Sequence, residues 1–111
     1  MNRSVFVILI PAMITFTTAA ASFDCHKATR ADELAVCTSQ KLSDLDVEMS
    51  VKYNFLRGLL AMGAAGNMVD EQKAWLKQRH QCHSDKACLK SVYLNRIMVL
   101  DAQYDKIDKP F

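Results

Sequence analysis

The sequence predicts an all-α domain, a small bundle of one short and three longer helices with two local disulfides, after a cleaved signal peptide. Apolar residues recur three and four positions apart along most of the chain, which is the spacing of helices that bury one face. The 111 residues include only 3 Gly and 2 Pro, too few for the many turns of an all-β fold. All 4 cysteines follow an N-terminal stretch typical of secreted proteins, and an even count in that setting indicates disulfides.

Residues 1–21 are predicted to be a secretory signal peptide. Arg3 provides a positive charge, an apolar run follows over residues 5–14, and three alanines before Ser22 supply the small side chains of a cleavage site. An apolar core of about ten residues is too short to cross a bilayer comfortably, so a retained membrane anchor is the less favoured alternative. We expect cleavage near Ala21 or Ser22.

Residues 22–111 are expected to form one small domain. The chain has 14 basic side chains, one of which (Arg3) leaves with the signal peptide, and 12 acidic ones, so the mature domain is nearly neutral. It therefore has neither the basic stripe of a nucleic-acid-binding protein nor an acidic field that would steer a basic partner. Its predicted place is the periplasm or the outside of the cell, without a membrane span after cleavage, and the pattern specifies no oligomeric state.

The cysteines are Cys25, Cys37, Cys82 and Cys88, and they allow three pairings. We favour the two pairs that are local in sequence, Cys25 with Cys37 and Cys82 with Cys88. In the chain-entropy account the longer loop contributes about 3 kcal/mol to stability and the shorter one about 2 kcal/mol. These amounts are a large share of the net stability of so small a domain.

A metal site is the alternative use of these cysteines, together with His26, His80 and His83. The Cys-x5-Cys spacing of the second pair matches no standard zinc finger, and secretion favours oxidised thiols. The sequence contains no Cys-x-x-Cys redox pair and no Gly-x-Ser-x-Gly nucleophile elbow. It thus predicts no metal, no other cofactor and no catalytic residue, and the protein is not expected to be an enzyme.

The first two helices are indicated by caps and spacing. The short one is expected to use Thr29 as its N-cap and to run to about Cys37, with Leu34 and Cys37 on one face. The second is expected to begin at Ser39 or Ser43 and to end near Gly63. Its apolar stripe comprises Leu42, Leu45, Met49, Tyr53, Leu56 and Leu60.

Two more helices are predicted after a flexible connector over residues 63–67. Asn67 is expected to cap the third helix and Ser84 the fourth. The buried stripe of the third helix is expected to comprise Val69, Gln72, Trp75 or Leu76, Arg79 and Cys82. That of the fourth is expected to comprise Cys88, Leu89, Val92, Tyr93, Ile97, Leu100 and Tyr104.

Arg79 is unusual because it places a charge on a buried stripe. Asp46 borders the stripe of the second helix, so we expect a partly buried ion pair between Asp46 and Arg79 that joins two helices. Trp75 is expected to fill the core. The sequence thus assigns structural roles to Asp46, Trp75 and Arg79.

Residues in both halves of the chain carry a resemblance to a known family. In the first half they are Phe23 to Ala28, Glu33, Cys37, Leu42, Leu45, Asp46 and Tyr53. In the second half they are Gln72, Trp75, Leu76, Arg79, Cys82, Cys88, Leu89, Tyr93, Arg96, Ile97 and Leu100. Over residues 23–100 the chain resembles the LprI-type lysozyme inhibitor domain of bacteria. The resemblance implies a helical fold with local disulfides, a place in the periplasm or at the envelope exterior, and inhibition of lysozyme.

If lysozyme is the partner, its cleft offers two catalytic carboxyl groups that a cation or a hydrogen-bond donor would suit. The candidate partner-binding residues are His80, His83 and Lys86, at the corner between the third and fourth helices, and the small-residue loop 63–67. The alternative function is that of an envelope accessory or immunity-type protein that binds another partner.

Overall fold

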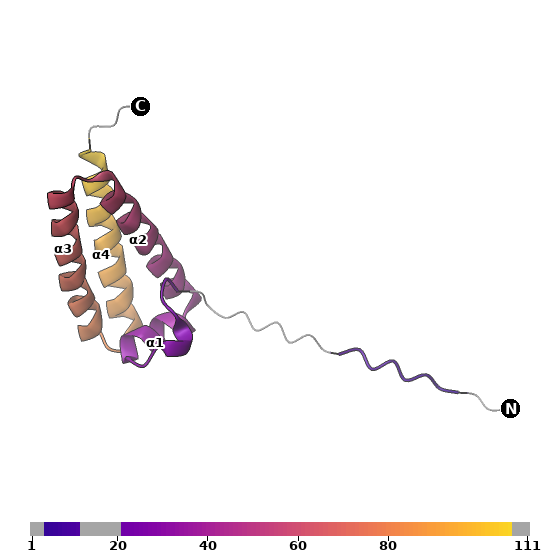
Figure 1. Cartoon of the computed structure of the whole chain (residues 1–111). Helices are drawn as coiled ribbons and strands as arrows, with labels where there is room; N and C mark the ends of the chain where they lie inside the picture. Colours follow the sequence, from indigo (N-terminus) through magenta and orange to yellow (C-terminus); the bar gives the residue numbers. More distant parts are fainter. Residues whose placement is uncertain (1–3, 12–20, 108–111) are drawn as a thin grey trace.

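A computed structural model describes residues 4–11 and 21–107 and confirms the all-α fold (Figure 1). Three helices of 20 residues lie side by side, and a short helix crosses one end of them. Residues 4–11 form no helix or strand, and residues 1–3 and 12–20 of the predicted signal peptide lie outside the described residues. The elements are η1 (Cys25–Lys27), α1 (Ala31–Thr38), α2 (Gln40–Leu59), α3 (Met62–Gln81) and α4 (Lys86–Asp105).

The second helix begins and packs as its sequence predicts. Of the two candidate serines, Ser39 is the cap, since its Oγ accepts a hydrogen bond of 3.3 Å from the Leu42 N–H. Ser43 is buried instead, and its Oγ donates to the Val36 carbonyl at 2.7 Å. The stripe of α2 is buried as predicted except for Leu60, which is only partly buried.

The connector between α2 and α3 is shorter than its sequence predicts. Residues 63–67 were expected to be a flexible loop, but they lie in the first turns of α3, and Asn67 does not cap it. Gly63 therefore does not end α2, which stops at Leu59. Alanine has the best helix propensity, and Ala64 and Ala65 offset part of the cost of the glycines. Neither glycine has a positive φ, so the chain does not use them to turn.

The short helix α1 is rotated relative to the expectation. Its N-cap position is Arg30 rather than Thr29, and no side chain caps it. Leu34 is 46% exposed, whereas the buried side chains are Asp32, Ala35 and Val36. The carboxylate of Asp32 is drawn inward because it has charged partners there, described below.

The disulfides have the predicted pairing. Cys25 is bonded to Cys37 with 5.8 Å between the Cα atoms, and Cys82 to Cys88 with 5.5 Å. The first bond ties the N-terminal segment to α1, and the second joins the end of α3 to the start of α4. No free cysteine occurs in the part of the chain that the structure describes.

The fourth helix is capped by Asp85 and not by Ser84. The Asp85 Oδ1 accepts a hydrogen bond of 3.1 Å from the Cys88 N–H. We expect Asp85→Ala to lower the free energy of unfolding by about 1 kcal/mol, because a helix N-terminus loses its cap. Ser84→Ala is the matched control and should change stability by less than about 0.5 kcal/mol. Urea denaturation measures both, and an equal loss in the two variants would contradict the assignment.

The core lies between α2, α3 and α4, with α1 closing its end. The side chains that fill it are mostly those of the predicted stripes, joined by Met68 of α3. Arg96 of α4 is also buried, although its charge gave no reason to place it there. No helix among residues 4–11 and 21–107 is both long enough and apolar enough to cross a bilayer.

Candidate functional site

A buried ion pair lies beneath the corner between α3 and α4. The Arg79 Nε donates to the Asp32 Oδ2 at 2.9 Å, and the two side chains are only 5% and 2% exposed. Asp32 comes from α1, so this pair fastens the short helix to α3. The sequence placed Asp32 only in a helix first turn and did not predict this partner.

Asp46 belongs to the same cluster but is less direct a partner of Arg79. The Asp46 Oδ1 lies 4.0 Å from the Arg79 Nη1, at the limit of an ion pair. The Tyr93 hydroxyl stands between them: it donates to the Asp46 Oδ1 at 2.8 Å and accepts from the Arg79 Nη1 at 3.3 Å. The expected contact between Asp46 and Arg79 is therefore present, but Asp32 is the nearer carboxylate and Tyr93 connects the rest.

The surroundings in the cluster shift the pKa values of its members. Burial raises the pKa of Asp32, but hydrogen bonds from His80 and Arg79 outweigh it, so the pKa lies below its ordinary value of 3.8. Burial and the Asp46 carboxylate raise the pKa of the Tyr93 phenol far above its ordinary range, which keeps this hydroxyl a donor. Burial lowers the pKa of Arg79, but Tyr93 and Asp32 raise it by more. The ion pair is therefore charged at neutral pH.

The lowered pKa of Asp32 predicts a loss of stability in acid. A carboxylate with a lowered folded pKa stabilises fully above its unfolded value and loses this contribution as the pH falls through the folded one. As the pH falls below about 4, the free energy of unfolding should thus fall more steeply in the natural protein than in Asp32→Asn. Denaturation at a series of pH values tests this, with Asp70→Asn on the exposed face of α3 as control. Equal slopes in the natural protein and Asp32→Asn would contradict it.

Arg79 also holds the N-terminal segment against the bundle. Its guanidinium carbon lies 5.4 Å from the ring centre of Phe23 and 5.9 Å from that of Trp75, both within cation–π range. Trp75 is buried in the core, and its indole N–H donates to the Val92 carbonyl at 3.1 Å. Arg79 therefore contacts residues from α1, α2, α4 and the N-terminal segment as well as its own helix.

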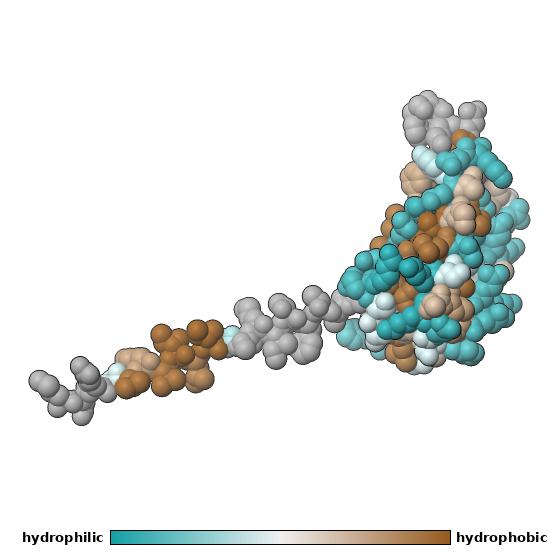
Figure 2. All heavy atoms as spheres, turned by 180° about the vertical axis from the view of Figure 1, so that it is seen from behind, coloured by the Kyte–Doolittle hydropathy of each residue, from teal (hydrophilic) through white to brown (hydrophobic). Residues whose placement is uncertain are grey.

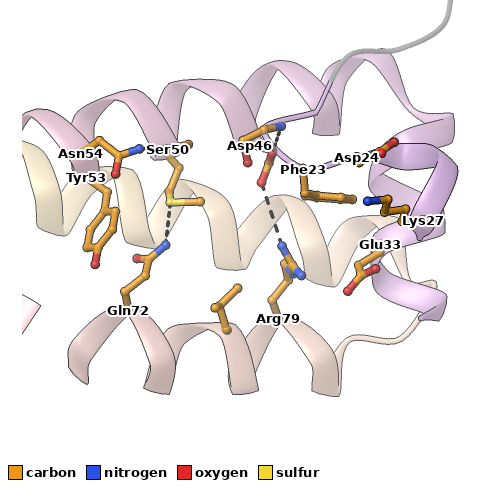
Figure 3. Close-up of a pocket in the computed structure, with 13 residues that line it drawn as sticks. Phe23, Asp24, Lys27, Glu33, Asp46, Ser50, Tyr53, Asn54, Gln72 and Arg79 are labelled. Atoms are coloured by element: carbon orange, nitrogen blue, oxygen red, sulfur yellow. Dashed lines mark hydrogen bonds and ion pairs between the residues drawn. The ribbon is translucent and has the colours of Figure 1, made fainter. Parts of the chain in front are cut away.

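A groove of about 510 Å³ opens beside this cluster (Figure 3). Asp24, Lys27 and Glu33 lie at one end of it, and Tyr53 and Asn54 with other polar side chains at the other. Two of its lining residues contact each other, since the Gln72 Nε2 donates to the Met49 Sδ at 3.2 Å. The walls carry charges of both signs and hydrogen-bonding groups, which suits a polar segment of a partner better than an apolar ligand.

The three candidate partner-binding residues at the corner differ in their surroundings. His80 is only 26% exposed, and its Nδ1 lies 2.7 Å from the Asp32 Oδ2, so its ring faces the buried cluster. His83 and Lys86 are exposed. His83 has φ of 51°, which is a left-handed conformation in the turn between the helices. Only His83 and Lys86 thus present their side chains outward.

A second surface is apolar. Figure 2 shows hydrophobic atoms gathered along the middle of the helical body between hydrophilic ones. Val51 and Phe55 of α2 and Leu94 and Met98 of α4 are the exposed apolar side chains in the central parts of these helices, with Val47 and Val99 beside them. The two helices are also joined by the ion pair of Lys52 with Asp101 at 2.8 Å.

In the described part of the chain, no three His, Cys, Asp or Glu side chains are grouped closely enough to hold a metal ion. The cysteines are consumed by disulfides, which removes their thiolates as ligands.

Fold and site together define a disulfide-stabilised helical domain in which buried polar groups connect the helices. The chain belongs to the LprI lysozyme inhibitor family: the profile described as "Lysozyme inhibitor LprI" matches residues 25–108. Inhibitors of this family are generally non-catalytic, and disulfides and family together are consistent with an extracytoplasmic location. Comparisons with curated proteins and with solved structures gave no match.

Proposed function

We propose that the mature domain works in the periplasm or outside the cell as a non-enzymatic protein that binds a lysozyme-type muramidase and blocks its cleft. The observation that carries this proposal is the family match, which covers residues 25–108 and thus nearly all of the mature domain. The predicted signal peptide and the two disulfides support an oxidising compartment as the place of action.

The corner between α3 and α4 is the proposed contact surface. The Cys82–Cys88 bond holds the turn, and a helix of 20 residues stands on each side of it. A turn fixed in this way loses little conformational entropy on binding. His83 and Lys86 supply hydrogen-bond donors, and Lys86 a positive charge, for the two catalytic carboxyl groups of a lysozyme cleft. His80 has a supporting role, because it is held by Asp32.

A turnover assay with the purified mature domain tests the proposal. We expect inhibition of at least one of several lysozyme types at micromolar concentration of the domain. Replacing His83 and Lys86 together by alanine should raise the inhibition constant about tenfold or more, as the loss of a small binding hot spot does. The matched control replaces Lys73 and Lys77, two exposed residues of α3, and should leave inhibition unchanged.

The outcomes test lysozyme inhibition and the proposed contact surface at the corner separately. No inhibition of any lysozyme type would remove the proposal and favour the alternative of an envelope accessory or immunity-type protein with another partner. Inhibition that survives the His83 and Lys86 replacements would keep the function and move the contact away from the corner.

Because the mature domain is nearly neutral, its association with the partner should also depend only weakly on salt.

A further inference from the structure

The carboxylate of Asp46 accepts a hydrogen bond from the backbone nitrogen of Ser22, the residue at which the mature chain is expected to begin. The distance from this nitrogen to the Asp46 Oδ2 is 2.6 Å, although the two residues are 24 positions apart. We propose that Asp46 is the binding site for the protein's own N-terminus: cleavage between Ala21 and Ser22 creates an ammonium group at Ser22, which forms an ion pair with Asp46. This inference is independent of the partner that the domain binds.

The position of the Ser22 nitrogen is fixed by the residues that follow it. The Phe23 ring lies against the Arg79 guanidinium at 5.4 Å, and Cys25 is bonded to Cys37. These two contacts hold the segment to the bundle on the side away from the leader. Ala21 also packs against the core, but neither of these contacts involves it, so we expect them to keep the nitrogen next to Asp46 after cleavage.

The two buried carboxylates of the cluster, Asp32 and Asp46, differ in how many cationic groups lie close to them. Asp32 has three cationic or basic groups within 4 Å, namely Arg79 at 2.9 Å, His80 at 2.7 Å and the half-exposed Arg30 at 3.5 Å. Asp46 is only 1% exposed.

Among the described residues, the close contacts of the Asp46 carboxylate are neutral. They are the Tyr93 hydroxyl and the Ser22 N–H, and Arg79 reaches it only at 4.0 Å. A buried carboxylate without a close cation is costly, and an ammonium group at Ser22 would supply one.

Hydrolysis of the Ala21–Ser22 bond provides this group. One water molecule is consumed, the carbonyl carbon of Ala21 becomes a carboxylate, and the nitrogen of Ser22 becomes an ammonium group that carries the released proton. The alanine run before Ser22 has the small side chains that a signal peptidase requires. Cleavage one residue later would remove the Ser22 nitrogen, and cleavage one residue earlier would leave only its N–H at Asp46. An ammonium group lies next to Asp46 only if Ser22 is the first mature residue.

The first test is the mass of the processed protein. The full chain, expressed with its own leader in a secreting bacterium, should yield an intact mass that begins at Ser22. A different first residue would overturn the proposal.

The second test isolates the charge from the hydrogen bond. Two chains are released from an N-terminal fusion by a protease that leaves no extra residue: one begins at Ser22 and the other at Ala21. The longer chain keeps the N–H of Ser22 and moves the ammonium group one residue away from Asp46. We expect a folding equilibrium constant roughly tenfold larger for the chain that begins at Ser22, because hydrogen bonds to charged groups are the stronger kind. In the Asp46→Asn background this advantage should disappear.

A reactivity measurement covers the case in which Asp46→Asn does not fold. In the folded natural chain that begins at Ser22, the terminal amine should react with an acylating reagent at neutral pH at least several-fold more slowly than in the urea-unfolded chain. The chain that begins at Ala21 should show little such protection. Equal stability of the two chains, or equal reactivity of their amines, would overturn the ion pair.

Discussion

Replacing Arg79 by methionine is expected to lower the free energy of unfolding by about 3–5 kcal/mol. Methionine keeps much of the apolar volume of the side chain but removes the guanidinium, so Asp32 loses its 2.9 Å ion pair and Tyr93 its donor. The remaining carboxylates of Asp32 and Asp46 then stay buried with one cation fewer. Chemical denaturation followed by circular dichroism measures the loss, and Lys77→Met on the exposed face of α3 is the control.

A double-mutant cycle decides which carboxylate is the main partner of Arg79. Asp32→Asn should be strongly destabilising alone and much less so when combined with Arg79→Met, because the combination leaves no unpaired charge at that position. Asp46→Asn should show a smaller coupling with Arg79→Met, since Tyr93 stands between the two groups. Additive effects at both positions would contradict the buried ion-pair cluster.

Local features of the fold were predictable from the sequence. The stripe of α2 follows from residue spacing, and both disulfides follow from the preference for short loops. The cap was narrowed to Ser39 or Ser43, and the structure shows that it is Ser39. Each of these features depends on residues that are close in sequence. Two errors were also local: residues 63–67 are helical although they contain two glycines, and Asp85 rather than its neighbour Ser84 caps α4. Propensity and cap preference are too weak to settle such choices alone.

The polar cluster could be predicted only in part. Arg79 was recognisable because a charge stood on an apolar stripe, and Asp46 because it bordered another. Asp32 is 47 positions from Arg79, and its burial depends on how α1 is rotated against the ends of the longer helices. An acidic residue in a helix first turn is explained by the helix dipole without any partner, so nothing in the sequence pointed separately to this contact. The contact of His80 with Asp32 was unpredictable for the same reason, since it also depends on the rotation of α1.

Trp75→Ala is expected to lower the free energy of unfolding by about 3–5 kcal/mol, because it empties a large part of the core. Trp75 is 5% exposed, and its ring packs edge-on against Tyr93 with 5.1 Å between the ring centres. Its loss would also loosen Tyr93, whose hydroxyl connects Asp46 with Arg79.

One further variant separates the packing of Trp75 from its hydrogen bond, and a second serves as a surface control. Trp75→Phe keeps an aromatic ring but removes the hydrogen bond to the Val92 carbonyl, and should cost about 1–2 kcal/mol. Leu94→Ala on the exposed side of α4 should cost less than about 1 kcal/mol. Equal losses in Trp75→Phe and Trp75→Ala would mean that the indole N–H, and not the packed volume, carries the effect.

If Trp75 supports the cluster through Tyr93, the combination of Trp75→Ala with Arg79→Met should cost less than the sum of the two single losses, because each variant already disturbs the same hydroxyl.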